Sequence, residues 1–363
     1  MRKLAKNLFI VLVTIIFIPA FSTSYHALSI DNLAYVLAIG IDSSDSNKLD
    51  VTFQFSTNVP ASESGANDKA SSIINTVSAS SLTNAINLLN GYLGKPINMS
   101  HCKVIIFSEE LAMKGISEEI YTLINNTQIR TSSNIVISKC TAKYYIEQTK
   151  PEFENLISKY YEIFSSSSKY TGYMPETTIG DFFNSLVCEN CEPHAILGGV
   201  NKGSSEEGNE FDSQKDYTIK SNQSPVIGEN GAENIGVAVF KGDKLVGELN
   251  ALESISFLNI SDKLDRFLIS VPDPQNANNY LDIYMTPLKK TSIKVDSSTK
   301  TPYIKLDSRF SGRIYSMSQN SKYLSNEVIN SISNSCNSYL ESIFTDYLYR
   351  TSKILKSDIN GIR

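Results

Sequence analysis

The residues best suited to chemistry stand together in one short segment, Cys188-Glu-Asn-Cys191-Glu-Pro-His194. Two thiols in a CxxC spacing with an imidazole nearby can supply three ligands to zinc. A structural zinc site usually takes a fourth ligand, which only His101 or another thiol could supply from far away in the sequence. The same thiols could instead close as a local disulfide or take part in thiol exchange. We expect incidental or core thiols here, with a local disulfide, a metal site and redox activity as the alternatives.

Few other residues could support catalysis. The chain has three histidines, His26, His101 and His194, and contains no GxSxG, HExxH or phosphate-binding loop. Glu109 and Glu110 could form an acid/base pair, but adjacent residues on a helix point about 100° apart. Their place at the start of a predicted helix explains them better, because the helix dipole favours negative charge there. We therefore expect no catalytic residue, no cofactor and no metal.

The stretch from Pro96 to Ile116 shows which elements must position these residues. Lys103–Phe107 is a short apolar, β-branched run that is typical of a strand buried on both faces. Ser108 is in the position of a helix N-cap, and Gly115 is well placed to end the helix. A buried strand that leads into a helix is half of an α/β unit, so the flanking segments should supply the rest.

Those flanking segments predict an N-terminal α/β domain over residues 30–150. Leu33–Asp42 and Leu49–Thr57 indicate a hairpin with one fully buried and one half-buried strand, and Pro60–Lys69 indicates a flexible excursion. Apolar runs and helical spacing predict further strands and helices at Ile73–Val77, Leu82–Leu93, Glu118–Asn125, Ile135–Ile137 and Ala142–Gln148. The β–α–β–α–β order predicts a sheet with helices packed across it.

The rest of the chain predicts a helical part, a linker and a C-terminal domain. Residues 151–203 carry helical patterns at Phe153–Phe164 and Thr178–Val187 and a short strand at Ala195–Val200, and residues 204–230 form a polar loop or linker. Residues 231–363 should form strands at 235–240, 267–271, 281–285, 291–295 and 303–306, then a long helix over Ser325–Lys356. Its apolar stripe should pack on the preceding sheet. We predict an α+β or mixed α/β fold of two or three domains, with mixed or antiparallel sheets.

The N-terminus indicates export. Arg2, Lys3 and Lys6 precede an apolar run from Leu8 to Ala20, and Ala20-Phe21-Ser22 is a small-residue exit, so residues 1–22 form a signal or anchor segment. The apolar run is shorter than the roughly 20 residues that span a bilayer. The net charge of −5 argues against nucleic-acid binding. Cys102, Cys140 and Cys336 lie in apolar-patterned segments and should be small core residues.

Five collinear blocks resemble the Ger(x)C family, the C subunits of spore germinant receptors in endospore-forming bacteria. The blocks are Leu33–Asp42, Ile97–Ile116, the neighbourhood of Arg130, Lys139 and Ala142, Gly236–Leu249, and Ser357–Ile362. The resemblance implies a non-enzymatic, membrane-associated protein on the outer surface of the spore inner membrane, with three α/β-type domains. Its implied partners are a polytopic A subunit and an integral-membrane B subunit, in a complex that responds to nutrients. The family has no established catalytic residues to carry over.

Two features depart from the family pattern. Family members are typically lipoproteins, but no Cys precedes Cys102 here, so we expect no lipidation and favour a retained N-terminal anchor over release. Relatives commonly continue past the block at Ser357–Ile362 with an aromatic tail that ends in a strand. We therefore expect the last domain to lack an edge strand. The strand next to the missing one would then have an edge with unpaired backbone groups.

Two other classes of protein compete with this interpretation. An exported solute-binding protein would use a cleft between the halves of the chain, although the sequence offers no convergent polar cluster for a small-molecule ligand. A thiol-active exported enzyme would depend on Cys188 and Cys191. The favoured hypothesis is a receptor subunit with no turnover.

Overall fold

Strand β1 (Ala34–Ser44) lies in the middle of the main sheet, and its apolar run is buried on both faces. It pairs antiparallel with β2 (Lys48–Ser56) and parallel with β5 (Val104–Ser108), so the predicted hairpin is confirmed. The computed structural model describes residues 2, 5–7, 9, 32–45, 48–56, 72–201, 218–296, 298, 303–316 and 325–362. Its contacts divide the chain into two compact units, Met1–Leu33 and Ala34–Arg363, and the fold described here is that of the second.

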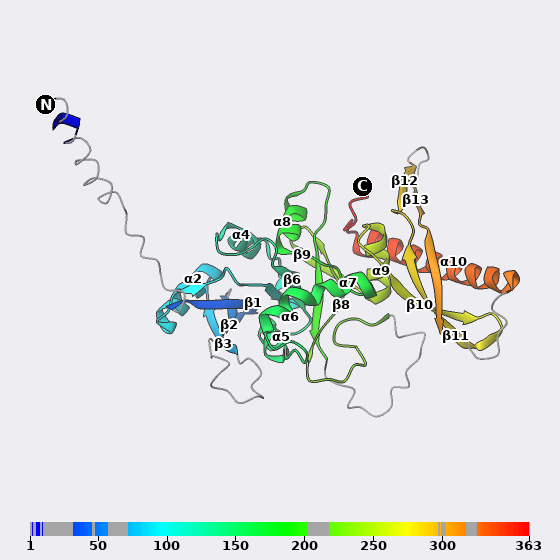
Figure 1. Ribbon diagram of the computed structural model, residues 1–363, viewed down its shortest axis with the longest axis horizontal. Coiled ribbons are helices and arrows are strands. Elements are labelled where there is room, and N and C mark those ends of the chain that lie inside the picture. The colour runs from blue at the N-terminus through cyan, green and yellow to red at the C-terminus, as the bar shows by residue number, and fades with distance from the viewer. Residues whose placement is uncertain are drawn as a thin grey trace. The chain divides into compact units, whose positions relative to one another are not determined.

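The main sheet is mixed. Its hydrogen-bonded order is β3-β2-β1-β5-β6-β7-β8-β9, with β4 paired to β1 (Figure 1). The four central strands β1, β5, β6 and β7 run parallel, and the strands on both sides run antiparallel. The remaining strands are β3 (Ser72–Ala79), β4 (Ile97–Asn98), β6 (Asn134–Ser138), β7 (His194–Val200), β8 (Ala232–Lys241) and β9 (Lys244–Leu249).

Helices cover both faces of this sheet. One core packs Ile105 and Phe107 of β5 against α2 (Leu82–Leu93), α3 (Glu109–Lys114), α4 (Ser117–Asn125) and α8 (Ile179–Val187). The opposite core packs Val104 and Ile106 against α5 (Ala142–Gln148), α6 (Ile157–Ile163) and the 3₁₀ turn η3 (Phe164–Ser167), which α7 (Ser168–Thr171) follows. Successive residues of β5 therefore face different cores, which is why its sequence is an unbroken apolar run.

The start and end of α3 are set by the residues that the sequence singled out. Ser108 has extended backbone angles, and its hydroxyl accepts a hydrogen bond from the Leu111 amide. Gly115 ends the helix at a φ of 116°, a conformation that side chains rarely adopt. A Cβ at this glycine would also meet the Asp243 carboxylate at 2.6 Å. The predicted strand–cap–helix unit is thus confirmed.

The C-terminal part adds a second sheet and a long helix. Strands β10 (Phe267–Asp273), β11 (Asn276–Pro287) and β14 (Phe310–Ser316) form an antiparallel sheet, and β12 (Ser292–Asp296) and β13 (Tyr303–Asp307) form a two-stranded ribbon. Helix α10 (Asn326–Tyr349) packs along β10 and α9 (Ala251–Ile260) and continues into a π-helical turn, η5 (Arg350–Leu355) (Figure 1). The fold is therefore mixed α/β with several sheets and a long C-terminal helix, as predicted.

The main sheet continues through the predicted linker. Strand β7 pairs antiparallel with β8, so the chain returns to the same sheet after residues 204–230. The helices of residues 151–203 lie in the connection between β6 and β7 and cover that sheet. Pairing within one sheet does not decide which segments fold as independent units. The domain boundaries predicted from the sequence therefore stay a prediction.

Five sequence-based expectations need correction or fall outside the described residues. Strand β2 is buried on both faces from Val51 to Phe55, because a helix covers each side of it. Its buried polar side chains bond to β3: the Thr52 hydroxyl pairs with that of Thr76, and Gln54 Nε2 donates to Ser72 Oγ. Strand β14 was missed, and α6 begins four residues later than predicted. The excursion at 60–69 and most of the export segment lie outside the described residues. Among the residues that the structure does describe, no helix is long and apolar enough to cross a membrane.

Candidate functional site

The carboxyl ends of the parallel strands carry a group of charges that is partly buried. Strands β5 and β6 pair in register, so Ser108 lies beside Ser138 and the residues that follow, Glu109 and Lys139, emerge at the same edge. In open α/β sheets this edge is where ligands usually bind. The end of β9 brings Glu248 to the same place.

Glu248 is the centre of this charged cluster (Glu109, Lys139, Lys220, Glu248 and Arg350). Its carboxylate is 8% exposed and receives Lys139 Nζ at 2.6 and 2.7 Å on its two oxygens, and Lys220 Nζ at 3.3 Å. Its backbone carbonyl accepts a hydrogen bond from Arg350 Nη2 at 2.9 Å. Glu109 begins α3, Lys139 follows β6, Lys220 precedes β8, Glu248 lies in β9 and Arg350 begins η5, so the charged cluster joins the N-terminal and C-terminal parts of the fold.

Arg350 extends the charged cluster to helix α9. Its Nη1 lies 3.1 Å from an oxygen of Glu253. The other oxygen of Glu253 accepts the Asn250 amide in a reciprocal capping box that starts α9. One arginine thus bonds to the end of β9 and to the first turn of α9.

The pKa values of the two carboxyl groups in the charged cluster, Glu248 and Glu109, are shifted in opposite directions. Burial opposes ionisation of Glu248, but the hydrogen bonds and charges of Lys139 and Lys220 outweigh it and hold its pKa below the ordinary value. Burial raises the pKa of Glu109, and the negative charge of Glu248 raises it further. A carboxylate satisfied by two lysines, beside a carboxyl group that keeps its proton to higher pH, suits a fixed joint between chain segments.

The predicted cysteine–histidine site has a different arrangement. The sulfurs of Cys188 and Cys191 are bonded to each other, so the preference for unpaired thiols is wrong at these positions and the alternative of a local disulfide holds. A disulfide has no thiolate to offer a metal. In the part of the chain that the structure describes, no three His, Cys, Asp or Glu side chains could hold a metal ion together.

The surroundings of His194 differ from those of the disulfide. It begins β7, is 8% exposed, and its ring meets Phe257 edge-on with 4.7 Å between centroids. Neither ring nitrogen has a hydrogen-bond partner. Burial, followed by the positive charge of Lys263, lowers the pKa of His194 to about 3, so the imidazole is neutral at ordinary pH.

The other residues singled out from sequence have structural partners. Glu110 pairs with Lys114 one turn along α3, and the same ammonium donates to Ser43. His101 is exposed and lies 4.8 Å, centroid to centroid, from the ring of Tyr35. Cys102 and Cys336 are buried and Cys140 is half-buried; burial raises the pKa of the Cys102 thiol to about 12, as expected for an inert core thiol.

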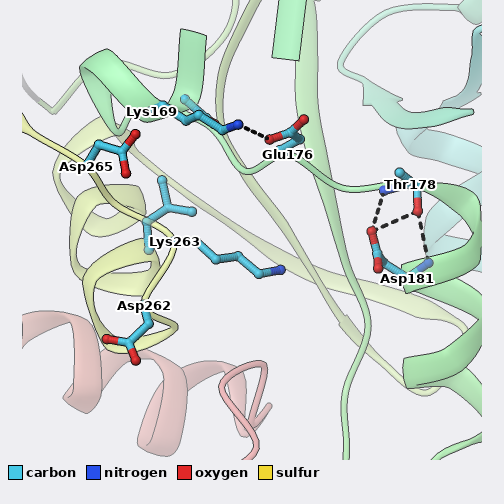
Figure 2. Close-up of a pocket in the computed structure, with 9 residues that line it drawn as sticks. Lys169, Glu176, Thr178, Asp181, Asp262, Lys263 and Asp265 are labelled. Atoms are coloured by element: carbon cyan, nitrogen blue, oxygen red, sulfur yellow. Dashed lines mark hydrogen bonds and ion pairs between the residues drawn. The ribbon is translucent and has the colours of Figure 1, made fainter. Parts of the chain in front are cut away.

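A cleft of about 490 Å³ lies between α7–α8 and the end of α9 (Figure 2). Its charged residues are Lys169, Glu176, Asp181, Asp262, Lys263 and Asp265. Lys169 pairs with Glu176 at 3.7 Å, and Asp181 closes a capping box with Thr178. Figure 2 shows the Lys263 side chain extending into the space between the two sides of the cleft. Its mixed charge would suit a zwitterionic solute.

Sequence reasoning missed Lys139, Lys220, Glu248 and Arg350 as members of one cluster. Their pairing joins segments far apart in the chain, which local patterns do not report. One signal was available, since Glu109, Lys139 and Glu248 each lie in a different block of the Ger(x)C resemblance.

The other two blocks are also tied into the fold by specific hydrogen bonds. Asp42 Oδ1 accepts the Ala142 amide at 2.6 Å, and Ser357 Oγ donates to the Phe240 carbonyl at 2.5 Å. The residues that carry the resemblance thus bind the segments of the fold to one another.

Comparison with known proteins agrees with these blocks. The family model for the spore germination protein N-terminal domain matches residues 26–198, and that for the spore germination B3/GerAC-like C-terminal region matches residues 235–363.

Two individual proteins are also similar to the chain. The spore germination protein GerQC of Bacillus cereus is 23% identical over 213 residues, which are 58% of this chain and 50% of that protein, so the chain spans about half the length of this relative. The crystal structure of the GerBC protein aligns over 89% of this chain and 84% of the GerBC chain, with 15% identity and a TM-score of 0.43. On the two family models, matched in order along the sequence, the chain belongs to the GerAC/GerBC, or Ger(x)C, family of spore germination proteins.

Proposed function

We propose that this protein is the non-catalytic C subunit of a nutrient germinant receptor at the outer face of the spore inner membrane. It would act with a polytopic A subunit and an integral-membrane B subunit, and be needed for the receptor to assemble and trigger germination. The observation that carries the proposal is the match of both family models, in order, over residues 26–198 and 235–363.

The chemistry of the charged cluster supports a role without turnover. Glu248 is neutralised by two lysines, and the blocks that carry the family resemblance hydrogen-bond segments of the fold together. A general acid or base needs a proton to exchange with a substrate, whereas these groups are committed to one another. Such a fold is suited to present a surface to partner subunits.

A germination assay tests the proposal. In spores whose only receptor locus encodes this chain and its A and B partners, deletion of this gene should abolish the nutrient-triggered fall in optical density. The gene supplied in trans should restore it, and a non-nutrient trigger should still work in both strains. Deletion spores that respond to nutrients like their parent would overturn the proposal.

The cleft of Figure 2 supports a second candidate, an exported solute-binding protein. Calorimetric titration of the purified chain with zwitterionic amino acids would detect such binding. A saturable heat that disappears in Lys263→Met would favour this candidate, and titrations without heat would remove it.

A thiol-active enzyme has less support, because the disulfide follows the C-terminus of α8. The negative end of a helix dipole disfavours the thiolate that thiol exchange requires. Cys188→Ser should therefore leave germination unchanged, and a loss of germination in that variant with normal protein levels would favour the enzyme instead.

A further inference from the structure

The ribbon formed by β12 and β13 is an amphipathic element that carries an apolar face without a covering element among the described residues. The register pairs Ile293 with Leu306 and Val295 with Ile304, so these four side chains share one face. Ile293, Val295 and Ile304 are 38%, 54% and 40% exposed, and only Leu306 packs against the neighbouring core. Figure 1 shows the ribbon projecting beyond β10 and β11.

The base of the ribbon is fixed to helix α9. Asn259, which is buried, donates to Thr291 Oγ1 at 3.1 Å and to Ser308 Oγ at 3.0 Å, one residue on each arm. The Thr291 amide donates to Asp262, and the Leu288 amide donates to the Arg309 carbonyl. These bonds hold both arms at their origin, so the exposed apolar face is presented in a defined direction.

The ribbon and its base are basic in an acidic protein. Residues 289–309 contain Lys289, Lys290, Lys294, Lys300, Lys305 and Arg309 against Asp296 and Asp307, whereas the whole chain has a net charge of −5. Lys294 and Lys305 lie directly across from each other on the face opposite the apolar one. Asp296 and Asp307 share this face, each two residues along from one of the lysines, so the excess of positive charge comes from Lys289, Lys290, Lys300 and Arg309.

We propose that the β12–β13 ribbon docks on an anionic lipid bilayer through Ile293, Val295 and Ile304. The ribbon is one backbone layer thick, so lysines on its opposite face reach headgroup phosphates when the apolar face enters the interface. Exposed apolar side chains supply the hydrophobic attraction, and each basic residue near an anionic surface adds an electrostatic attraction. The proposal does not rest on receptor membership, because it depends only on the chemistry of this ribbon.

Tryptophan fluorescence tests the proposal directly, because the chain contains no Trp. In the full-length protein, Val295→Trp places a single reporter on the apolar face, and Tyr92→Trp places one on α2 at a position that is 77% exposed. Vesicles of phosphatidylglycerol with brominated acyl chains should shift the Val295→Trp emission to shorter wavelength and quench it. The Tyr92→Trp emission should stay unchanged, which separates the ribbon from any attachment by the N-terminal apolar segment.

Charge and fold controls complete the test. Adding Lys294→Glu and Lys305→Glu to Val295→Trp should lower the quenched fraction about tenfold at limiting lipid, and high salt should lower it as well. Ile304→Trp, the cross-strand neighbour, should reproduce the shift if Val295→Trp fails to fold.

Three results would overturn the proposal. Unquenched ribbon reporters in anionic vesicles would exclude insertion of the apolar face. Equal quenching in phosphatidylcholine would exclude recognition by charge. A shift that appears without lipid and grows with protein concentration would assign the face to a second copy of the chain.

Discussion

His194 shows how the fold keeps a titratable side chain neutral. Its ring packs against Phe257, neither nitrogen has a hydrogen-bond partner, and the pKa is lowered from 6.5 to about 3. Between these two values the unfolded chain binds a proton that the folded chain does not. The stability contributed by neutral His194 is therefore complete above pH 6.5 and is lost as the pH falls toward 3.

Replacing His194 with an apolar residue should flatten the acid side of the stability profile. We predict that His194→Leu loses less stability than the parent on going from pH 7 to pH 5, by about 1 to 2 kcal/mol. Urea unfolding at both pH values measures the difference. Parallel pH profiles for the two proteins would show that His194 does not carry this proton linkage.

The charged cluster makes a second prediction about single residues. Lys139→Met removes the closest partner of a carboxylate that is 8% exposed, and should cost about 2 to 4 kcal/mol of unfolding free energy. Lys103→Met is the matched control, because its pair with Glu162 is more exposed and longer, at 3.4 Å; it should cost less than about 1 kcal/mol. Equal costs in urea unfolding would contradict the central place of Glu248.

At the residue scale, the sequence predicted what depends on near neighbours. Ser108 and Gly115 set the ends of α3 through bonds and backbone angles within a few residues, and both were identified in advance. The partner of Glu109 was not, because Glu248 reaches it only after β9 joins the sheet. The disulfide could only be one of several alternatives, since a CxxC spacing permits bonded, metal-bound and free thiols alike.

Among the elements, helix α10 shows most clearly where the burial predicted from the sequence differs from the burial in the structure. The sequence placed Ile329, Ile332, Cys336, Leu340, Ile343 and Tyr347 in one stripe. In the structure Leu340 is 5% exposed and belongs to the C-terminal core, whereas Ile329 is 47% exposed. The apolar stripe of α10 is therefore longer than the part of the C-terminal core on which the helix packs.

This difference predicts unequal costs within one stripe. Leu340→Ala should lower the free energy of unfolding by about 2 to 4 kcal/mol, because it leaves a cavity in the core. Ile329→Ala should change it by about 0.5 kcal/mol, as a surface substitution does. Thermal and urea unfolding of the two variants would measure the costs, and a larger loss in Ile329→Ala would show that the helix packs on a different face.

Strands with strong apolar patterns were found, whereas the two-residue strand β4 and the weakly patterned strand β14 were missed. Strand β14 reads FSGRIYS and is half-buried or exposed throughout, so no alternation of apolar and polar residues marks it. It forms because β11 offers it a hydrogen-bonding edge, which is information outside its own sequence. Central strands such as β5 were predictable because burial on both faces demands an apolar run.

For the whole molecule, the sheet links the two regions that the family models match. Strand β7 closes the first region and β8 opens the second, and the two strands pair over most of their length. We predict that residues 30–203 expressed alone expose the edge of β7 and aggregate, and that co-expression with residues 218–363 restores a complex of the two fragments. Size-exclusion chromatography distinguishes the outcomes, and a monomeric, folded 30–203 fragment would show that the boundary separates independent domains.

Affinity purification from spore membranes tests the central claim most directly. A tagged copy of this chain, extracted in mild detergent, should bring down one polytopic and one further integral-membrane protein from the same locus. Its amount should fall sharply in spores that lack either of them. Recovery of the tagged chain alone, at the parental level in spores without those two proteins, would contradict its assignment as a receptor subunit.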